Sequence, residues 1–228
     1  MARLARLVVP GLPHHVTQRG NGRACVFFSD GDYGFYRALL AERCAAAGVK
    51  VWAWGLMPNH VHLILVPSDE DGLRRALAPT HRRYAGHVRT REKRTGHFWQ
   101  GRFGCVAMDD AHLAAALVYV AMNPVRARLV DRAQDWRWSS VHAHLRRVTD
   151  DGLTTARPVL ERFADLAERI AAGEDPTISE RLRKAELIGR PVGTVDFIAA
   201  LERQTGRRFL RVKPGPKPRD AALLESGG

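Results

Sequence analysis

The stretch Val49–Val66, VKVWAWGLMPNHVHLILV, predicts two buried strands joined by a tight turn. Its first half is rich in β-branched and aromatic residues, and its second half ends in the apolar run LILV. Pro58 and Asn59 separate the halves, and both residue types favour turns. Because an unbroken apolar run is typical of a strand covered on both faces, we expect the second strand to be central in its sheet.

Two histidines, His60 and His62, open the second strand. Residues i and i+2 of a strand point to the same side, so the two imidazoles project together and Val61 points the other way. Such a pair can hold one divalent ion. Most HxH sequences are incidental, however, and a plain pair of surface histidines is the alternative. The neighbouring sequence supplies no third ligand.

The order of the flanking patterns predicts an α+β, ferredoxin-like fold. A strand fits HHVTQRG at residues 14–20, and apolar residues at helical spacing follow at residues 33–47, with Ser29 or Asp30 as cap and Gly48 as stop. After the two central strands we expect a helix at residues 69–91 and a short strand at residues 103–109. The β-α-β-β-α-β order is typical of one sheet with both helices on one face.

Beyond this unit, a third helix is expected to begin at Asp110, its cap, and to end at Asn123 before Pro124. Further helices fit residues 158–172 and residues 195–205. We therefore divide the chain into an α+β domain at residues 1–147, a helical C-terminal extension at residues 148–210 and a basic, proline-rich, flexible tail at residues 211–228.

The composition points to a polyanionic partner. The formal charge is +12 and the pI is near 10.5. Residues 81–103 hold seven Lys or Arg and one Glu, and residues 203–219 hold seven more and no acid. Aromatic residues between the charges favour nucleic acid over a solvated helix face or a membrane surface. No apolar run is long enough to span a bilayer, and Pro10 and Pro13 interrupt the N-terminal apolar patch, so we expect a cytoplasmic, nucleoid-associated protein.

The third helix carries two residues that can complete a site with the histidines. Tyr119 and Asn123 are four residues apart and share one helical face. If that face lies over the histidine pair, Asn123 can supply an amide oxygen to the ion and Tyr119 can present its hydroxyl to a substrate. The alternative is structural, with Tyr119 at the edge of the core and Asn123 as a C-cap before Pro124. Spacing alone leaves both interpretations open.

The chemistry open to such a site is narrow. Two neutral imidazoles and an amide oxygen bring no negative charge, so a bound Mg²⁺ or Mn²⁺ keeps its Lewis acidity for an anion such as a phosphodiester. A tyrosine hydroxyl has a pKa of about 10 and needs such help to attack phosphorus. The products would be a phosphotyrosine link and a free DNA hydroxyl, and this exchange of one ester for another is reversible.

An ordered set of motifs resembles one family. The motifs are MPNHVH at residues 57–62, GHFWQGRF at 96–103, YVAMNPVRARLV at 119–130, PGLPHHVTQRGNGRACVFFSDGDYGFY at 10–36 and DWRWSSVHAHL at 135–145. They are similar to the single-tyrosine HUH transposases of the IS200/IS605 type, and most of all to the REP-associated tyrosine transposases. The resemblance covers about residues 3–145 and continues more loosely in GRPVGTVDFIAALERQTGRR and KPGPKPR. It implies cleavage of single-stranded DNA beside an imperfect hairpin, with Mg²⁺ or Mn²⁺ and a 5′-phosphotyrosine intermediate.

Carried over residue by residue, the resemblance implies His60 and His62 as metal ligands, Tyr119 as nucleophile and Asn123 as third ligand, and it leaves a monomer and a homodimer equally open. The basic stretch suits such DNA, because its charges can follow phosphates while His97 and Trp99 stack on unpaired bases. Arg102 is a candidate for the scissile phosphate or for covering the sheet edge, and Trp99 is equally a candidate core residue. The residues expected along the phosphates are Arg82, Arg83, Arg89, Arg91, Lys93 and Arg94.

Two other functions stay open at this level. A non-catalytic regulator that binds DNA or RNA hairpins would keep the fold and the basic surfaces but would need no tyrosine. A metal hydrolase that activates water would cleave DNA without a covalent adduct.

Overall fold

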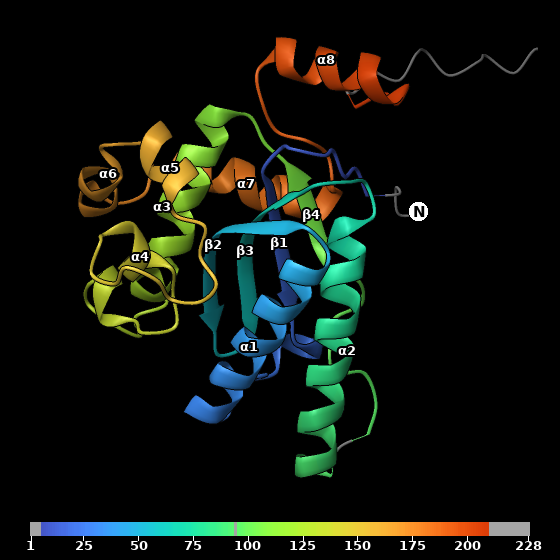
Figure 1. The fold of residues 1–228 in the computed structure, drawn as a ribbon, viewed down its shortest axis with the longest axis vertical. Helices are drawn as coiled ribbons and strands as arrows, with labels where there is room; N and C mark the ends of the chain where they lie inside the picture. Colours follow the sequence, from blue (N-terminus) through green and yellow to red (C-terminus); the bar gives the residue numbers. More distant parts are fainter. Residues whose placement is uncertain (1–5, 94, 210–228) are drawn as a thin grey trace, which may run out of the picture.

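A four-stranded antiparallel sheet forms the centre of the computed structural model, which describes residues 6–93 and 95–209 (Figure 1). The strand order is β2-β3-β1-β4, so β3, which carries the histidine pair, is central as predicted. Two buried apolar clusters cover the two faces of the sheet. The strands are β1 (His14–Arg19), β2 (Val49–Met57), β3 (His60–Pro67) and β4 (Gly104–Ala107).

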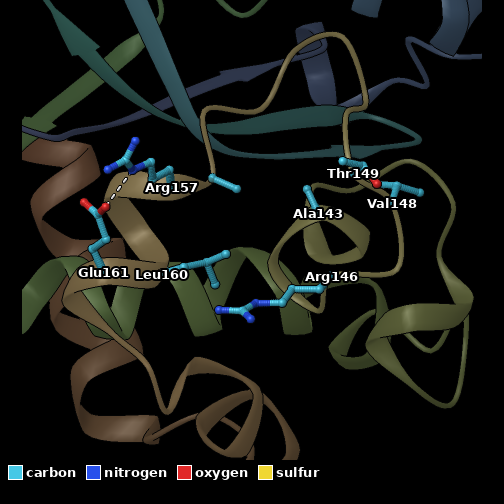
Figure 2. Close-up of a pocket in the computed structure, with 8 residues that line it drawn as sticks. Ala143, Arg146, Val148, Thr149, Arg157, Leu160 and Glu161 are labelled. Carbon is cyan, nitrogen blue, oxygen red and sulfur yellow. Dashed lines mark hydrogen bonds and ion pairs between the residues drawn. The ribbon is translucent and has the colours of Figure 1, made fainter.

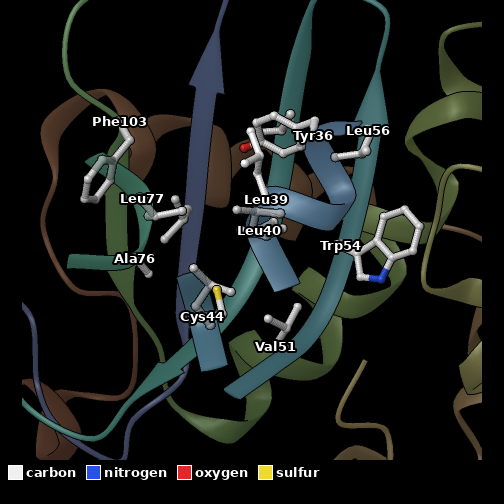
Figure 3. Close-up of a cluster of buried hydrophobic side chains, with 14 of the residues drawn as sticks. Tyr36, Leu39, Leu40, Cys44, Val51, Trp54, Leu56, Ala76, Leu77 and Phe103 are labelled. Atoms are coloured by element: carbon white, nitrogen blue, oxygen red, sulfur yellow. The ribbon is translucent and has the colours of Figure 1, made fainter. Parts of the chain in front are cut away.

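Helices α1 (Asp30–Ala46) and α2 (Gly72–Glu92) cover one face of the sheet, which confirms the ferredoxin-like arrangement (Figure 1). Helix α1 begins earlier than its apolar spacing predicts because the Ser29 side chain caps it, accepting the N–H of Asp32. Figure 3 shows the core that these helices close over the sheet. Its labelled members include Tyr36, Leu39, Leu40, Cys44, Val51, Trp54, Leu56, Ala76, Leu77 and Phe103.

A β-bulge in β2 places consecutive side chains of this strand in the cores on both faces of the sheet. Its register with β3 shifts between Val51 and Ala53. As a result, Val51 and Trp54 belong to the core under α1 and α2, whereas Trp52 and Ala53 belong to the core on the opposite face. Beyond the bulge, Gly55 pairs with His62 of β3.

Helix α3 (Asp110–Arg126) packs on the opposite face and begins at Asp110 as predicted, but its predicted cap and its predicted C-terminal end were wrong. Asp109, not Asp110, is the N-cap, because its side chain accepts the N–H of His112 at 3.0 Å. The helix also continues through Pro124 to Arg126. A proline has a helical φ and removes only one backbone donor, so the burial of α3 against the sheet can hold the last turn in place.

The chain after α3 covers both edges of the sheet. At the β2 edge, Leu56 N–H donates to Trp138 O at 2.9 Å and Thr155 N–H donates to Val51 O at 2.7 Å. At the β4 edge, Val192 N–H donates to Ala107 O at 2.9 Å. These contacts satisfy backbone groups that an open edge would present to other chains.

Five further α-helices follow α3 in the described part of the chain. One helix was expected at residues 158–172, but Phe163 leaves helical geometry (φ −130°, ψ 74°) and divides it in two. The break lets Val159 and Leu166 both reach the core under α3. The helix at residues 176–188 was not predicted at all. The helices are α4 (Val141–His144), α5 (Arg157–Arg162), α6 (Leu166–Ala172), α7 (Pro176–Ile188) and α8 (Val195–Thr205).

Helix α8 has the predicted ends, with Thr194 capping the N–H of Phe197 and Gly206 in the left-handed region (φ 66°). Helices α6 and α7 pack against α3, so the extension is in contact with the helix that carries Tyr119. The division at residue 147 stays a prediction. The basic tail at residues 211–228 and Arg94 lie outside the described residues. Within the described ranges, none of the helices has the length and apolar character of a membrane span.

Candidate active site

The histidine pair lies on the face of β3 that α3 covers. The ring centroids of His60 and His62 are 4.8 Å apart, with the ring planes at 84°. His62 is buried and His60, at the start of the strand, is half-buried. Val61 belongs to the core on the other face, as the alternation of a strand predicts.

Tyr119 of α3 lies against His62, the buried member of this pair. Its ring centroid is 5.3 Å from that of His62, and the two rings meet edge to face at 85°. A second histidine, His15 of β1, is 5.8 Å away in a similar edge-on contact. Tyr119 is also part of the core under α3 and is 4% exposed. The ring therefore sits at the boundary between the apolar core and the histidines.

Gly55 sets how closely α3 approaches the sheet at this point. It pairs with His62 across the two strands, and a Cβ at Gly55 would lie 3.2 Å from Val120 Cγ1 and 3.4 Å from Val120 O. Pro124 leaves that carbonyl without its helical donor. Gly55 was not among the predicted site residues, although a glycine inside an apolar strand is a signal for close backbone approach.

Asn123 follows Tyr119 by one helical turn, on the same stripe of α3 as Arg126. Arg126 stacks on Tyr119, with its Cζ 4.2 Å from the ring centroid. Asn123 is buried, and its Nδ2 has no hydrogen-bond partner in the described part of the chain. Because the helix ends at Arg126 with Ala127 as C-cap, the interpretation of Asn123 as a C-cap was wrong.

Both imidazoles use Nδ1 for a hydrogen bond inside the protein. His60 Nδ1 donates to Asn59 Oδ1 at 2.5 Å, and the Asn59 amide nitrogen donates to Arg23 O at 3.2 Å. His62 Nδ1 is 3.0 Å from His15 Nε2. His62 Nε2 is buried and has no partner within the described residues. Metal-bound histidines typically have this arrangement, with one ring nitrogen anchored and the other available.

From the sequence, Asn59 was expected only as a turn residue and His15 only as part of the first strand. His15 is in fact a buried residue of β1 that contacts a candidate ligand. Its role depends on the pairing of β1 with β3, which places residues far apart in sequence on one face.

Burial keeps the histidine pair neutral. It lowers the pKa of His60 to about 3, with the charges of Arg19 and Arg126 contributing, and it holds the pKa of His62 well below the usual 6.5. A neutral imidazole has the lone pair that a metal requires. Among the described residues, no group of three or more His, Cys, Asp or Glu is placed to hold a metal. The histidine pair nevertheless fits a divalent ion, because the buried His62 Nε2 has no partner within the described residues. The Asn123 atom without a partner is the donor Nδ2, which does not bind a cation, so the role of the Asn123 oxygen as third ligand stays a prediction.

The GHFWQGRF loop lies at the same end of the sheet as the histidine pair. Asn21 N–H donates to Phe98 O at 2.9 Å, and Gln100 N–H donates to Arg19 O at 2.8 Å. Arg19 in turn pairs with His60. The exposed residues among those predicted to contact DNA are His97 and Arg102 in the loop and Arg82, Arg83, Arg89, Arg91 and Lys93 on α2 and at its end.

Two residues assigned to DNA contact have partners inside the protein. Arg91 donates through NH1 and NH2 to the carboxylate of Asp32, which is 1% exposed. Trp99 donates its indole N–H to His81 O at 2.9 Å and packs on Phe98. These contacts explain both residues without DNA, so we leave Arg91 and Trp99 out of the interface proposed below, and their DNA contacts stay predictions.

A surface cavity of about 470 Å³ lies beside α4 and α5 (Figure 2). None of the candidate site residues lines it, and its Arg157 is already paired with Glu161 at 2.7 Å. The lining side chains include no nucleophile activated by a base and no pair of metal ligands, so we give this cavity no part in the chemistry.

Comparison with known proteins identifies the family. The family model described as Transposase IS200 like matches residues 8–123, a range that includes the histidine pair, Tyr119 and Asn123. The chain belongs to the IS200-like transposase family. This transposase is thus a member of a family of DNA-processing enzymes, and its resemblance to the REP-associated branch is confirmed.

Two relatives illustrate the resemblance. A protein of Haemophilus influenzae assigned by name to the REP-associated tyrosine transposases is 27% identical over 118 residues, which is 47% of this transposase and 67% of that protein. A solved REP-associated tyrosine transposase, bound to a REP hairpin, matches with a TM-score of 0.56 at 21% identity, over 64% of this transposase and 87% of that chain. The solved structure shows that the fold is shared.

Proposed function

We propose that this transposase cuts and rejoins single-stranded DNA at hairpin-flanked sites through a covalent 5′-phosphotyrosine bond at Tyr119. The observation that carries the proposal is the contact of the Tyr119 ring with His62, 5.3 Å between centroids, beside a second histidine on the same strand face. The Tyr119 ring contacts two imidazoles, those of His62 and His15, and shares one stripe of α3 with the buried Asn123 amide. Packing alone does not require so many polar groups around one tyrosine.

His60, His62 and the Asn123 side-chain oxygen would hold Mg²⁺ or Mn²⁺, and the neutral state of the two imidazoles and the buried His62 Nε2 without a partner favour this. When bound, the ion supplies Lewis acidity to the phosphate. His15 and Asn59 anchor the two imidazoles through Nδ1, so the rings need not reorganise when the site fills. Arg126 stacks on the Tyr119 ring and limits the directions in which the ring can turn.

The reaction exchanges one phosphodiester for another. The Tyr119 hydroxyl oxygen attacks phosphorus, the bond from phosphorus to the 3′ oxygen breaks, and the phenolic proton is released as the 3′ hydroxyl takes one up. The 5′ phosphate stays on Tyr119. Because no high-energy bond is lost, a 3′ hydroxyl can attack the phosphotyrosine and rejoin the strand.

The proposed DNA partner rests on charge and on the family. The exposed cations of α2 and of the GHFWQGRF loop can follow phosphates, which gives affinity without sequence choice. The solved relative is bound to a REP hairpin, and we propose a hairpin of that kind as the substrate here.

One experiment tests the proposal against its rivals. The transposase is incubated with single-stranded hairpin DNA and Mn²⁺ or Mg²⁺, and products are examined for a protein–DNA adduct that survives denaturation. We expect an adduct with the wild type and with Tyr33→Phe, a tyrosine in the opposite core, and none with Tyr119→Phe. Cleavage by Tyr119→Phe would instead indicate a hydrolase that activates water, and binding without cleavage by any variant would indicate a regulator.

A further inference from the structure

Arg19 is the last residue of β1 and pairs directly with His60, the first residue of β3. Residues that pair across an antiparallel ladder point to the same face of the sheet. The Arg19 guanidinium therefore leaves the sheet on the face that holds His60, His62 and the Tyr119 ring.

The Arg19 side chain is half-buried, yet within the described residues no carboxylate, carbonyl or ring accepts from it. Two other arginines have such partners: Arg6 donates to Phe103 O, and Arg91 donates to Asp32. The guanidinium nitrogens of Arg19 are not among the buried polar atoms without partners, so solvent reaches them. A guanidinium has five donors and no acceptor, so an arginine in this state beside a candidate active site can bind a ligand that brings acceptors.

The second arginine of the site is already engaged. Arg126 forms an ion pair with Glu174 and stacks on Tyr119. The charges of Arg19 and Arg126 both reach the histidine pair, since both contribute to the lowered pKa of His60. Arg19 is thus the arginine of the site that can still bind a ligand. An anion beside the histidine pair would be stabilised by the charges of both Arg19 and Arg126.

We infer that Arg19 binds the non-bridging oxygens of the phosphodiester that Tyr119 attacks. This inference rests on the proposed function and assigns one more substrate-binding residue to it. A guanidinium can donate two parallel hydrogen bonds to a phosphate, and those bonds strengthen as negative charge grows on the oxygens during attack. The assignment also replaces Arg102, which the sequence suggested for this role but which is exposed on the loop.

The test compares Arg19 with Arg102 on the hairpin that forms the adduct. With saturating DNA and Mn²⁺, we expect Arg19→Ala to slow single-turnover adduct formation about 100-fold, as the loss of one preorganised donor to a developing charge typically does. Arg19→Lys should recover part of this rate, because it keeps the charge and loses the planar fork. Arg102→Ala should weaken DNA binding but leave the saturated rate within about threefold.

A chemically altered substrate separates contact from support of the fold. Once the wild type has marked the cleavage position, a methylphosphonate at that phosphate removes its charge. Relative to normal DNA, binding of this DNA should be about tenfold more weakened for the wild type than for Arg19→Ala, which keeps only the contact with the metal ion, a pattern that a structural role would not produce. Arg19→Ala at the wild-type rate, or equal sensitivity of both proteins to the methylphosphonate, would overturn the inference. Failure of the wild type to form any adduct would instead refute the proposed function.

Discussion

Gly55 and Val120 approach each other so closely that a methyl group on Gly55 would lie 3.2 Å from Val120 Cγ1. Gly55 also pairs with His62, and Val120 follows Tyr119 in the chain. The contact of strand and helix at this one point thus sets the separation between the candidate nucleophile and the candidate metal ligands.

Gly55→Ala should therefore harm catalysis more than folding. The added methyl group requires Val120 to give by a few tenths of an ångström, and we expect the adjacent Tyr119 to shift with it, which is costly in rate. We expect adduct formation to slow at least tenfold while the protein stays folded, as measured by single-turnover assay and by urea unfolding. Gly86→Ala is the control, because nothing lies within 4 Å of a Cβ there and alanine favours the exposed helix α2.

Asn59→Ala should weaken metal binding. The Asn59 side chain accepts the Nδ1–H of His60, and loss of such an anchoring bond typically costs about 10- to 100-fold in metal affinity. Titration of the protein with Mn²⁺, followed by electron paramagnetic resonance, measures this directly and needs no DNA. Asn21→Ala, at an exposed position nearby, should bind Mn²⁺ as the wild type does. Equal affinities for the two variants would contradict the anchoring role.

Stability should fall as the pH drops from 7 to 4. His14 accepts the N–H of Val9 through Nε2 and donates from Nδ1 to Leu12 O, and burial lowers its pKa to about 4. The unfolded chain binds a proton near pH 6.5, whereas the folded chain resists it until about pH 4, so protons favour unfolding within this window. His14 alone would remove about 2 kcal/mol of unfolding free energy between pH 7 and pH 5.

Urea unfolding at several pH values measures this effect. His14→Gln should be less stable at pH 7 and should lose less stability on acidification, because glutamine does not titrate. His97→Gln, at an exposed loop position, should keep the wild-type dependence. His81, whose pKa burial lowers to about 3, adds a loss of the same sign over the same range.

Two arginines of α2 should separate folding from DNA binding. Arg91→Ala removes the partner of a buried carboxylate, and we expect a loss of about 1–2 kcal/mol in unfolding free energy. Arg89→Ala should leave stability unchanged and should lower DNA affinity and its salt dependence. Denaturation curves and binding at two salt concentrations distinguish the outcomes. A large affinity loss for Arg91→Ala at unchanged stability would return Arg91 to the DNA interface.

Local patterns were sufficient to predict the sheet and its two covering helices. Strand alternation placed His60 and His62 on one face, and turn residues separated β2 from β3 as observed. Helix ends were harder to predict. Asp109 and Asp110 are both plausible caps, and only the hydrogen bond to His112 chooses between them. Helix α7 has apolar residues at helical spacing, Ile178, Leu182 and Ala185, so its pattern indicated a helix that the prediction missed, and the helix packs against α3.

By itself, the sequence determined the order of strands and helices. It also determined that His60 and His62 share one strand face and that Tyr119 and Asn123 share one helix face, because each of these features depends on residues a few positions apart. The tertiary structure alone decided which groups surround them. His15 and Arg19 reach the histidine pair only because β1 pairs with β3 in one register, and a slip of one residue would turn both side chains to the opposite face. Register depends on the packing of the whole sheet, which no short segment specifies.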